Sequence, residues 1–382
     1  MKTSLKLAVI TATTLASVPT VYSATWVADA RGNAMGNTGV TTADYLLAPF
    51  YNPALTAVYK DVDDVGILLP GISVAARDTD ESLSTIDDIQ DAIDDFDESA
   101  TQSNINDLNG YLDDLDGNSP LTVDANLGAA IALPMESLSL NLFARGYAEI
   151  IATPDVAAKT GTDAASTRTR YENSEVNLIA FGYTEVGIAL AKKLAIAGQT
   201  VAVGISPKIQ QIRTYKETVT VEDFDLSDYD ESEKKKSTLN LDLGAVWLIE
   251  NYRAGIAVKD LFAQKIKTFD GENTYHLNTQ VTVSGAYVTP FFTAAVDMDL
   301  TKQKRYESSG DDTQFLRLGI EGDAWGWAQL RAGYEIDMKN NIDDSFTAGI
   351  GISPGDVVSI DVAGTYAGEN QMGVSANLAF TF

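Results

Sequence analysis

The 382-residue sequence contains no cysteine and a single histidine, His276. The absence of cysteine excludes a disulfide scaffold, a thiol redox site and a cysteine-based zinc site. A lone histidine also excludes a histidine-rich metal centre. Metal cofactors that are held by cysteines or by several histidines are therefore excluded for this chain.

The sequence also lacks a long apolar run that could form a transmembrane helix, which needs roughly 18 consecutive apolar residues. The amino terminus carries Lys2 and Lys6, followed by a short apolar stretch, 7–21, that Thr and Ser dilute. We interpret residues 1–23 as a signal peptide for Sec-type export. An exported chain of this kind can be integral to a membrane only through its strands.

Basic residues are scarce, since 27 Lys and Arg stand against 54 Asp and Glu and give a formal charge of −27. Such a chain repels the phosphates of nucleic acids. We therefore expect no direct nucleic-acid binding through its general surface.

Period-2 alternation of apolar and small or polar residues recurs along the chain and ends at the terminal Phe382. A strand of this form that closes on an aromatic carboxy-terminus resembles the insertion signal of bacterial outer-membrane barrels. Each segment approaches the 9–11 residues of a tilted spanning strand. We predict about 14 strands, near 63–77, 121–133, 136–151, 174–193, 199–221, 238–249, 252–262, 276–289, 291–300, 313–322, 327–338, 345–353, 357–366 and 371–382.

The connections between these strands alternate between short and long. Short turns at one end and longer external loops at the other are typical of outer-membrane barrels, and a β-sandwich has no reason to keep this parity. The parity places both termini in the periplasm. Aromatic residues gather beside the proposed periplasmic turns, either as an interfacial girdle or as ordinary core aromatics near turns: Trp247, Tyr252, Phe291, Phe292, Trp325, Trp327 and Phe382.

The first long connection is an exception to the strand pattern. Residues 80–116 contain thirteen Asp and Glu and no Lys or Arg, with apolar residues at helical spacing. This predicts an acidic hairpin of two amphipathic helices, an insertion over 80–117. The insertion is a solvated loop with a small core of its own, or a docking surface for a basic partner or a divalent cation.

A glycine-rich stretch, 30–40, precedes an Ala-Pro-Phe-Tyr-Asn-Pro-Ala-Leu box at 48–55. The glycines follow no strand of a βαβ unit, so a dinucleotide loop is excluded, whereas glycine permits close approach of backbone to a barrel wall. Together these motifs resemble the amino-terminal hatch of the FadL-like outer-membrane barrels, and more specifically the TraF-type conjugal transfer proteins of that superfamily. The plug residues identified by this resemblance are Gly32, Gly36, Gly39, Asn52, Pro53 and Ala54.

The resemblance implies a 14-stranded barrel, a plug, and, for the fatty acid transporters, passage of hydrophobic compounds through a pocket and a side opening. The expected lumen face is charged instead. Buried charges of both signs favour paired networks that hold a plug, whereas a hydrophobic tunnel would be lined by apolar side chains. This polar lumen network comprises Arg145, Glu149, Glu185, Asp242, Asp297, Arg317, Glu321, Arg331, Glu335 and Asp361.

Signals for catalysis and for metal binding are weak. His276 stands near the outer end of its strand without a nucleophile at a recognisable spacing, which indicates a water-exposed rim histidine. We predict no catalytic residues and no cofactor. Two acidic loop clusters are candidate Ca²⁺ sites or plain acidic loops, although neither fits the twelve-residue calcium loop: Asp113, Asp114 and Asp116, and Asp223, Asp225, Asp228 and Asp230.

The sequence thus predicts a single closed antiparallel transmembrane β-barrel of the outer membrane, with the helical insertion in its first external loop. The expected divisions are a signal peptide (1–23), a plug (24–62) and the barrel (63–382). The expected function is that of a non-enzymatic accessory component of conjugal transfer, with outer-membrane lipid and other envelope or conjugation components as partners. The alternatives are a transporter of small hydrophobic compounds and an outer-membrane enzyme.

Overall fold

The computed structural model describes residues 27–225, 232–307 and 312–382. The predicted signal peptide lies outside these residues, as do Asp228 and Asp230 of the second acidic cluster. None of the helices in the described ranges is long and apolar enough to cross a membrane.

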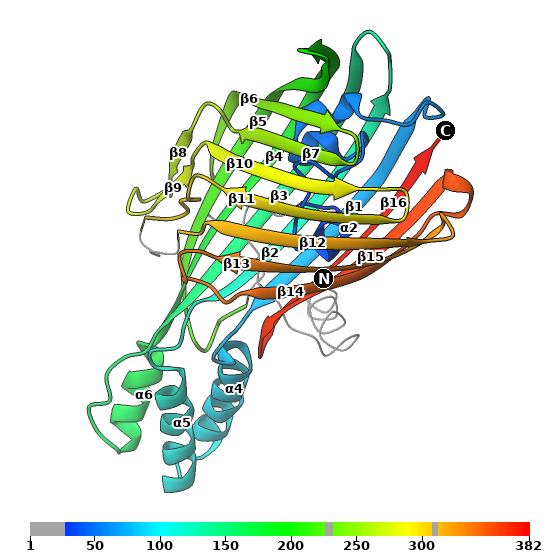
Figure 1. Ribbon diagram of the computed structural model, residues 1–382. Helices are drawn as coiled ribbons and strands as arrows, with labels where there is room; N and C mark the ends of the chain where they lie inside the picture. Colours follow the sequence, from blue (N-terminus) through cyan, green and yellow to red (C-terminus); the bar gives the residue numbers. More distant parts are fainter. Residues whose placement is uncertain (1–26, 226–231, 308–311) are drawn as a thin grey trace.

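Fourteen antiparallel strands close into one barrel, in which β1 pairs with β16 and the other neighbours follow chain order, with β7 beside β10 (Figure 1). This confirms the fold predicted from the alternation. The wall strands are β1 (Gly66–Arg77), β2 (Leu121–Leu133), β3 (Ser139–Asp155), β4 (Glu175–Ile196), β5 (Gln199–Thr220), β6 (Lys234–Ile249), β7 (Tyr252–Lys259), β10 (Gln280–Val288), β11 (Phe292–Asp299), β12 (Phe315–Ala324), β13 (Ala328–Asp337), β14 (Ser345–Ile352), β15 (Val358–Gly368) and β16 (Gln371–Thr381).

Burial alternates along the wall strands, as strand β3 illustrates. Asn141, Arg145 and Glu149 face the lumen and are buried, whereas Leu142 and Ala148 face outward and are exposed. Exposed Leu, Ile, Val and Phe side chains continue around the outer face of the other strands. An apolar outer belt over a polar lumen is the pattern of a barrel that spans lipid.

The two ends of the barrel differ. The short turns that precede β3, β5, β7, β11, β13 and β15 lie at one end with the carboxy-terminal Phe382, here called the turn end. The long connections and the tight β15–β16 turn lie at the other, the loop end (Figure 1). The seven aromatic residues predicted beside the short turns are all exposed, from 43% for Phe292 to 81% for Trp325. Such a set of exposed aromatics fits an interfacial girdle better than core packing.

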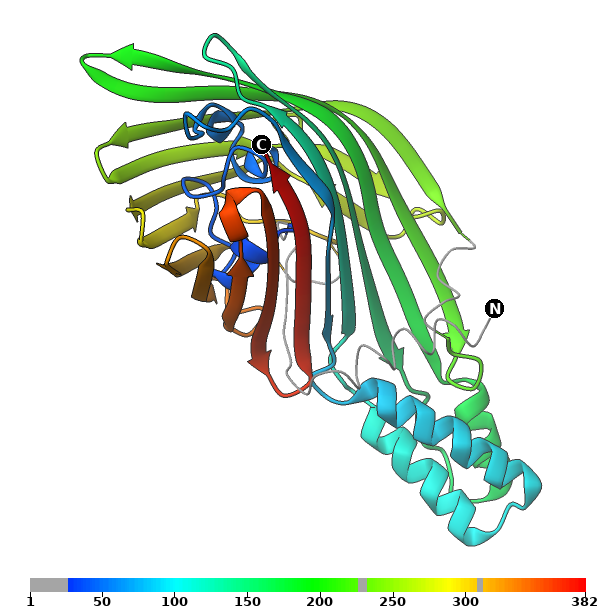
Figure 2. The same cartoon turned by 90° about the vertical axis from the view of Figure 1, so that its right-hand side faces the viewer.

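Strand length is uneven around the barrel. Strands β4 and β5 have 22 residues each, whereas β7, β11 and β14 have eight. The long strands β2–β5 continue toward three helices at the loop end (Figure 2).

Two of these helices, α4 (Ser82–Glu98) and α5 (Gln102–Leu115), form the predicted acidic hairpin. A third helix, α6 (Ala164–Glu172), was not predicted, because its Ser, Thr and Arg residues leave no apolar periodicity. The helices bury a common core with the strand ends. They thereby cover outward-facing residues such as Val176 and Leu178, which would otherwise expose apolar surface beyond the membrane belt.

The amino-terminal segment 27–57, here called the plug, lies inside the barrel (Figures 1 and 2). It is built from α2 (Ala30–Ala34), α3 (Ala48–Tyr51) and the 3₁₀ helix η1 (Pro53–Ala57). A second 3₁₀ helix, η2 (Pro354–Asp356), forms the last short turn.

The predicted strand 276–289 is divided in the structure. Its first residues belong to β9 (Thr274–Leu277), which pairs with β8 (Gln264–Lys267) in a separate two-stranded sheet, and the wall strand β10 begins only at Gln280. The connection from β7 to β10 therefore carries a hairpin of its own, which the sequence analysis treated as loop.

Leu108 is fully buried between the helical hairpin and the strand ends. We expect Leu108→Ala to destabilise this cover by about 2–5 kcal/mol, because the lost methyl groups leave a cavity. Limited proteolysis should then cut α4 and α5 in the variant while the heat-modifiable gel shift of the barrel is retained. Asp91→Ala, on the exposed face of α4, is the control, and equal protease resistance of Leu108→Ala would contradict the packing.

Candidate functional site in the lumen

The plug backbone lies against glycines of the barrel wall. A methyl group on Gly333 of β13 would overlap the backbone of Gly36, and one on Gly319 of β12 would overlap Met35. Gly36 itself has φ of +63°, a left-handed conformation that glycine adopts without strain. Glycine on both partners is what allows the plug to reach the wall here.

The opposite side of the plug approaches two further wall glycines. Pro53 and Ala54 lie against Gly204 of β5, and the Asn52 side chain lies against Gly244 of β6. Asn52 also donates from Nδ2 to the Val40 carbonyl at 2.9 Å. The Asn-Pro-Ala motif therefore packs both on the wall and on the glycine-rich part of the plug.

The remaining plug glycines, Gly32 and Gly39, both lie against the ring of Tyr51. The Tyr51 hydroxyl donates to Asp29 Oδ2 at 2.9 Å, and Asp29 caps α2 by accepting from the Arg31 and Gly32 amides. Burial raises the pKa of the Asp29 carboxyl to about 6. The plug is thus folded around one buried tyrosine–aspartate pair.

Side chains from the wall bind the plug backbone directly. Asp297 Oδ2 of β11 accepts hydrogen bonds from the Gly39 and Val40 amides at 2.9 and 3.0 Å. The Thr347 hydroxyl of β14 accepts from the Gly36 amide at 2.8 Å. Buried backbone amides need such partners, so these contacts fix the height of the plug in the barrel.

A chain of charges joins the plug to four wall strands. Arg31 binds Glu321 through two hydrogen bonds of 2.8 and 2.9 Å, and Arg331 donates to Glu321 and Asp361 at 2.6 Å each. Asp361 accepts from Asn377, whose Oδ1 accepts from the Ala30 amide. The chain leaves the plug at Arg31 and returns to it at the adjacent Ala30, at the start of α2.

A neighbouring group holds the central glycine turn. Arg317 donates to Asp299 at 2.9 Å and to Glu335 at 2.7 Å. The side-chain amide of Asn37 in the plug donates to the same Glu335 at 3.3 Å. The polar residues predicted on β11–β13 and β15 thus surround the plug.

The other predicted charges gather on the long strands. Lys208 Nζ lies 3.2 Å from Glu185, 3.0 Å from Asp242 and 2.9 Å from Asp260, all of them largely buried. Arg145 lies beside this group, with its guanidinium 5.4 Å from the centre of the Tyr183 ring. Sequence analysis missed Lys208, although its place on the lumen face of β5 follows from the same alternation as Asp242.

Residues from two long connections enter the lumen from the loop end. Arg305 forms an ion pair with Glu149 of β3, and the Tyr306 hydroxyl donates to the Ala180 carbonyl at 2.6 Å. Tyr275 of β9 stacks on Phe181 with ring centres 3.5 Å apart. Glu149, predicted to belong to a network that holds the plug, therefore pairs with a residue of a long connection. The sequence of these connections shows no pattern that would have revealed this pair.

His276 is 5% exposed, so the prediction of a water-exposed rim histidine is wrong. It lies on β9 between the lumen and the loops, with Nε2 3.2 Å from Glu307. Burial lowers its pKa below the ordinary value.

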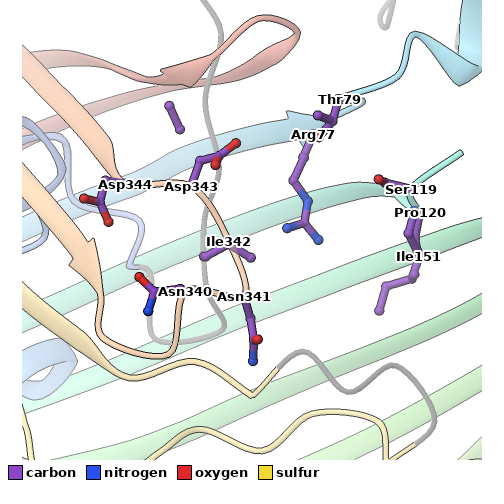
Figure 3. Close-up of a pocket in the computed structure, with 11 residues that line it drawn as sticks. Arg77, Thr79, Ser119, Pro120, Ile151, Asn340, Asn341, Ile342, Asp343 and Asp344 are labelled. Carbon is purple, nitrogen blue, oxygen red and sulfur yellow. The ribbon is translucent and has the colours of Figure 1, made fainter.

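The cavity beside His276 is small, at about 30 Å³, and polar residues such as Arg145, Lys259 and Gln280 line it. This space holds one or two water molecules, whereas an apolar cavity known to bind benzene measures about 150 Å³. A larger cavity of about 690 Å³ lies at the loop end beside the 340–344 loop, with polar side chains that include Arg77 and Asp343 arranged around it (Figure 3).

The candidate calcium residues have other partners or lie apart. Asp113 binds Lys159 and Arg170 at 2.8 Å each, and Asp223 accepts from Thr220. The described part of the chain contains no group of three or more His, Asp or Glu placed to hold a metal ion.

Residues 49–299 match the model of the family described as "F plasmid transfer operon, TraF, protein". None of the curated proteins matches the sequence. The family match confirms the resemblance to the TraF-type proteins, and the solved structures described next share the barrel fold.

Similar solved structures are monoaromatic hydrocarbon channels. CymD shares 11% identity at a TM-score of 0.57, over 92% of this chain and 97% of CymD. The toluene transporter TbuX of Ralstonia pickettii shares 12% at 0.56, over 92% and 97% of the two chains. The toluene transporter TodX of Pseudomonas putida shares 9% at 0.53, over 96% and 99%. These similarities show that the chain shares the barrel fold of these channels.

The contact of the plug with Gly333 predicts a permeability change. Gly333→Ala should displace the plug, because the added methyl group overlaps the Gly36 backbone. Cells with this variant should become sensitive to a bulky antibiotic that the outer membrane excludes. Gly322→Ala is the matched control, since a methyl group there meets no atom within 4 Å. Equal resistance of the two variants would contradict the seating of the plug on the wall.

The Lys208 cluster predicts a loss of stability. Lys208→Met should destabilise the barrel by about 3–5 kcal/mol, because it leaves three buried carboxylates without their shared cation. The temperature at which the heat-modifiable band converts should fall, and Lys208→Arg should restore part of the loss. Lys339→Met, at an exposed site, serves as control. An unchanged conversion temperature in Lys208→Met would refute this role.

Proposed function

Because this chain belongs to the family of F plasmid transfer operon TraF proteins, we propose that it is an accessory outer-membrane component of conjugal transfer. In this proposal residues 1–23 direct Sec-type export and are removed, residues 24–62 form the plug, and residues 63–382 form the barrel. The turn end faces the periplasm and the loop end faces the outside, where other envelope or conjugation components meet it.

The observation that carries the proposal is that the lumen and the loop end are built differently. The lumen charges bind the plug and an external loop, as in the Arg31–Glu321 and Arg305–Glu149 pairs. The loop end is built out by long strands and three helices that do not contribute to the lumen (Figure 2). A barrel that fills its lumen and extends its outer end is suited to contact more than to conduction.

The plug motif and the polar lumen network are, in this proposal, the parts that keep the barrel closed. Their charges are paired within the protein, and the lumen cavity beside His276 is smaller than an aromatic hydrocarbon requires. Because these charged groups bind each other, they are largely occupied and do not offer binding partners to a transported ligand.

The alternative is transport of small hydrophobic compounds across the outer membrane. Its specific support is an aromatic cluster in the loop-end half of the lumen, formed by Tyr147, Phe181, Tyr183, Tyr275 and Tyr306. The printed names of the similar channels include toluene transporters, which gives the compound class to test.

The external helices give the experiment. Asp88, Asp91 and Asp95 are exposed on α4, and their joint replacement by Lys should lower plasmid transfer if this acidic surface meets the transfer apparatus or the recipient. The barrel should still assemble, because these side chains lie outside the buried core. Transfer frequency and toluene uptake would be measured in the same strains.

The matched control variant replaces three exposed acidic residues at the turn end by Lys, namely Asp61, Glu136 and Glu250. Lower transfer in the α4 variant alone, with unchanged toluene uptake, is the expected result. Unchanged transfer in both variants and in a strain lacking the protein would refute the accessory role. Toluene uptake that disappears with the protein would favour the transporter.

A further inference from the structure

A row of small outward-facing residues crosses the long strands near the loop end. Ala125 pairs with Ala148, Ala148 with Gly182, and Gly182 with Arg213, across β2, β3, β4 and β5. Lys235 of β6 continues the row beside Arg213. Cross-strand partners lie side by side on the same face, so the row leads directly to two basic side chains.

The small side chains leave a groove of about 440 Å³ on the outer face. Ile72 and Leu127 border it toward the turn end, and Ile150 and Tyr215 border it toward the helices. Ala125 and Ala148 are exposed in its floor. The groove is therefore an apolar trough, open to the lipid side, with Arg213 at one end.

Two basic side chains, Arg213 and Lys235, stand at the end of the groove. Lys235 is exposed and Arg213 is partly exposed on the outer face, whereas Lys234 and Lys236 alternate with Lys235 and face the other side of β6. Among the described residues, Glu233 is the carboxylate beside them, 3.1 Å from Arg213 Nε and 3.8 Å from Lys235 Nζ, and Arg213 also donates to Gln211. In the described part of the chain, two outward-facing cations thus flank one carboxylate, which leaves a positive charge at this end of the groove.

The position of this surface relative to the apolar belt is defined by the strand pairing. One outward-facing row of cross-strand partners comprises Thr184, Gln211 and Ser237. The next outward-facing row toward the turn end comprises Val186, Ile209 and Leu239, which are 64%, 62% and 71% exposed. Arg213 and Lys235 lie one row beyond Gln211 and Ser237 toward the loop end. They therefore stand at the height where apolar belt gives way to headgroups.

We propose that this groove and its basic end bind a phosphorylated glycolipid of the outer leaflet, with a lipid phosphate on Arg213 and Lys235 and an acyl chain in the groove. The assignment rests on the outer-membrane location and orientation proposed above, which place the loop end in the external leaflet. Arg offers a fork of donors that suits phosphate, and Lys adds a mobile charge. Thr184, Gln211 and Ser237 supply neutral partners for sugar hydroxyls and amides.

The test uses the purified full-length protein in detergent micelles, titrated with lipid A and followed by native mass spectrometry. Each basic residue beside an anionic lipid surface strengthens binding about fivefold, so Arg213→Gln with Lys235→Gln should weaken lipid A binding about 25-fold. Ala148→Leu, which fills the groove from an exposed position, should weaken it as well. Lys339→Gln, another exposed lysine of the loop end, should bind as the wild type does.

Two further lipids identify what is recognised. Lipid A without its phosphates should bind the wild type as weakly as the double variant does, and phosphatidylglycerol should bind less tightly than lipid A. Equal lipid A affinity of the wild type and the double variant would overturn the phosphate site. Unchanged binding by Ala148→Leu would overturn the groove, and equal affinity for phosphatidylglycerol would overturn the glycolipid. These outcomes are independent of conjugal transfer, so failure of the accessory role would not alter them.

Discussion

The close approach of the plug backbone to glycines of the wall is the contact on which the rest of the structure depends. Gly319, Gly333 and Gly204 leave room for plug backbone, and Gly244 leaves room for the Asn52 side chain, where any wall side chain would overlap the plug. With the plug seated there, wall carboxylates such as Asp297 come within hydrogen-bond reach of plug amides. The lumen charges then have partners, which buried charges require.

A lumen filled in this way directs function to the surface. The plug occupies the turn-end half, and Arg305 and Tyr306 enter from the loop end. Conduction would require both to move, at the cost of separating buried ion pairs. The outer surface, by contrast, carries elaborated features: a helical cover over long strands and a basic groove at the edge of the apolar belt. This distribution of structure supports the proposed role in contact between envelope components.

The sequence was sufficient for those parts that local periodicity determines. Alternation located the wall strands to within a few residues, and the parity of loop lengths placed the start of β1 and the end of β16 at the same end of the barrel, because both follow from the geometry of a spanning strand. The amphipathic spacing of Ile86, Ile89 and Ile93 likewise predicted α4. The same alternation identified the charges on the lumen face. It also places Lys208 on that face, although the prediction did not include this residue.

What the sequence could not predict is the path of the long loops. Helix α6 lacks apolar periodicity and forms where Tyr171 meets the hairpin core. The β8–β9 hairpin and Arg305 depend on contacts with strands far away in the chain, and no local pattern encodes these contacts. His276 was misplaced for this reason, since a residue at the apparent rim of a strand is buried once the loops fold inward.

The central claim, that the plug is a packed part of the barrel, is tested most directly by hydrogen–deuterium exchange on the protein in lipid nanodiscs. The account predicts that amides of residues 30–57 exchange as slowly as those of the wall strands, because their hydrogen bonds are buried inside the lumen. Exchange of this segment within seconds, with the wall strands protected, would show that the plug is not seated and would contradict the account.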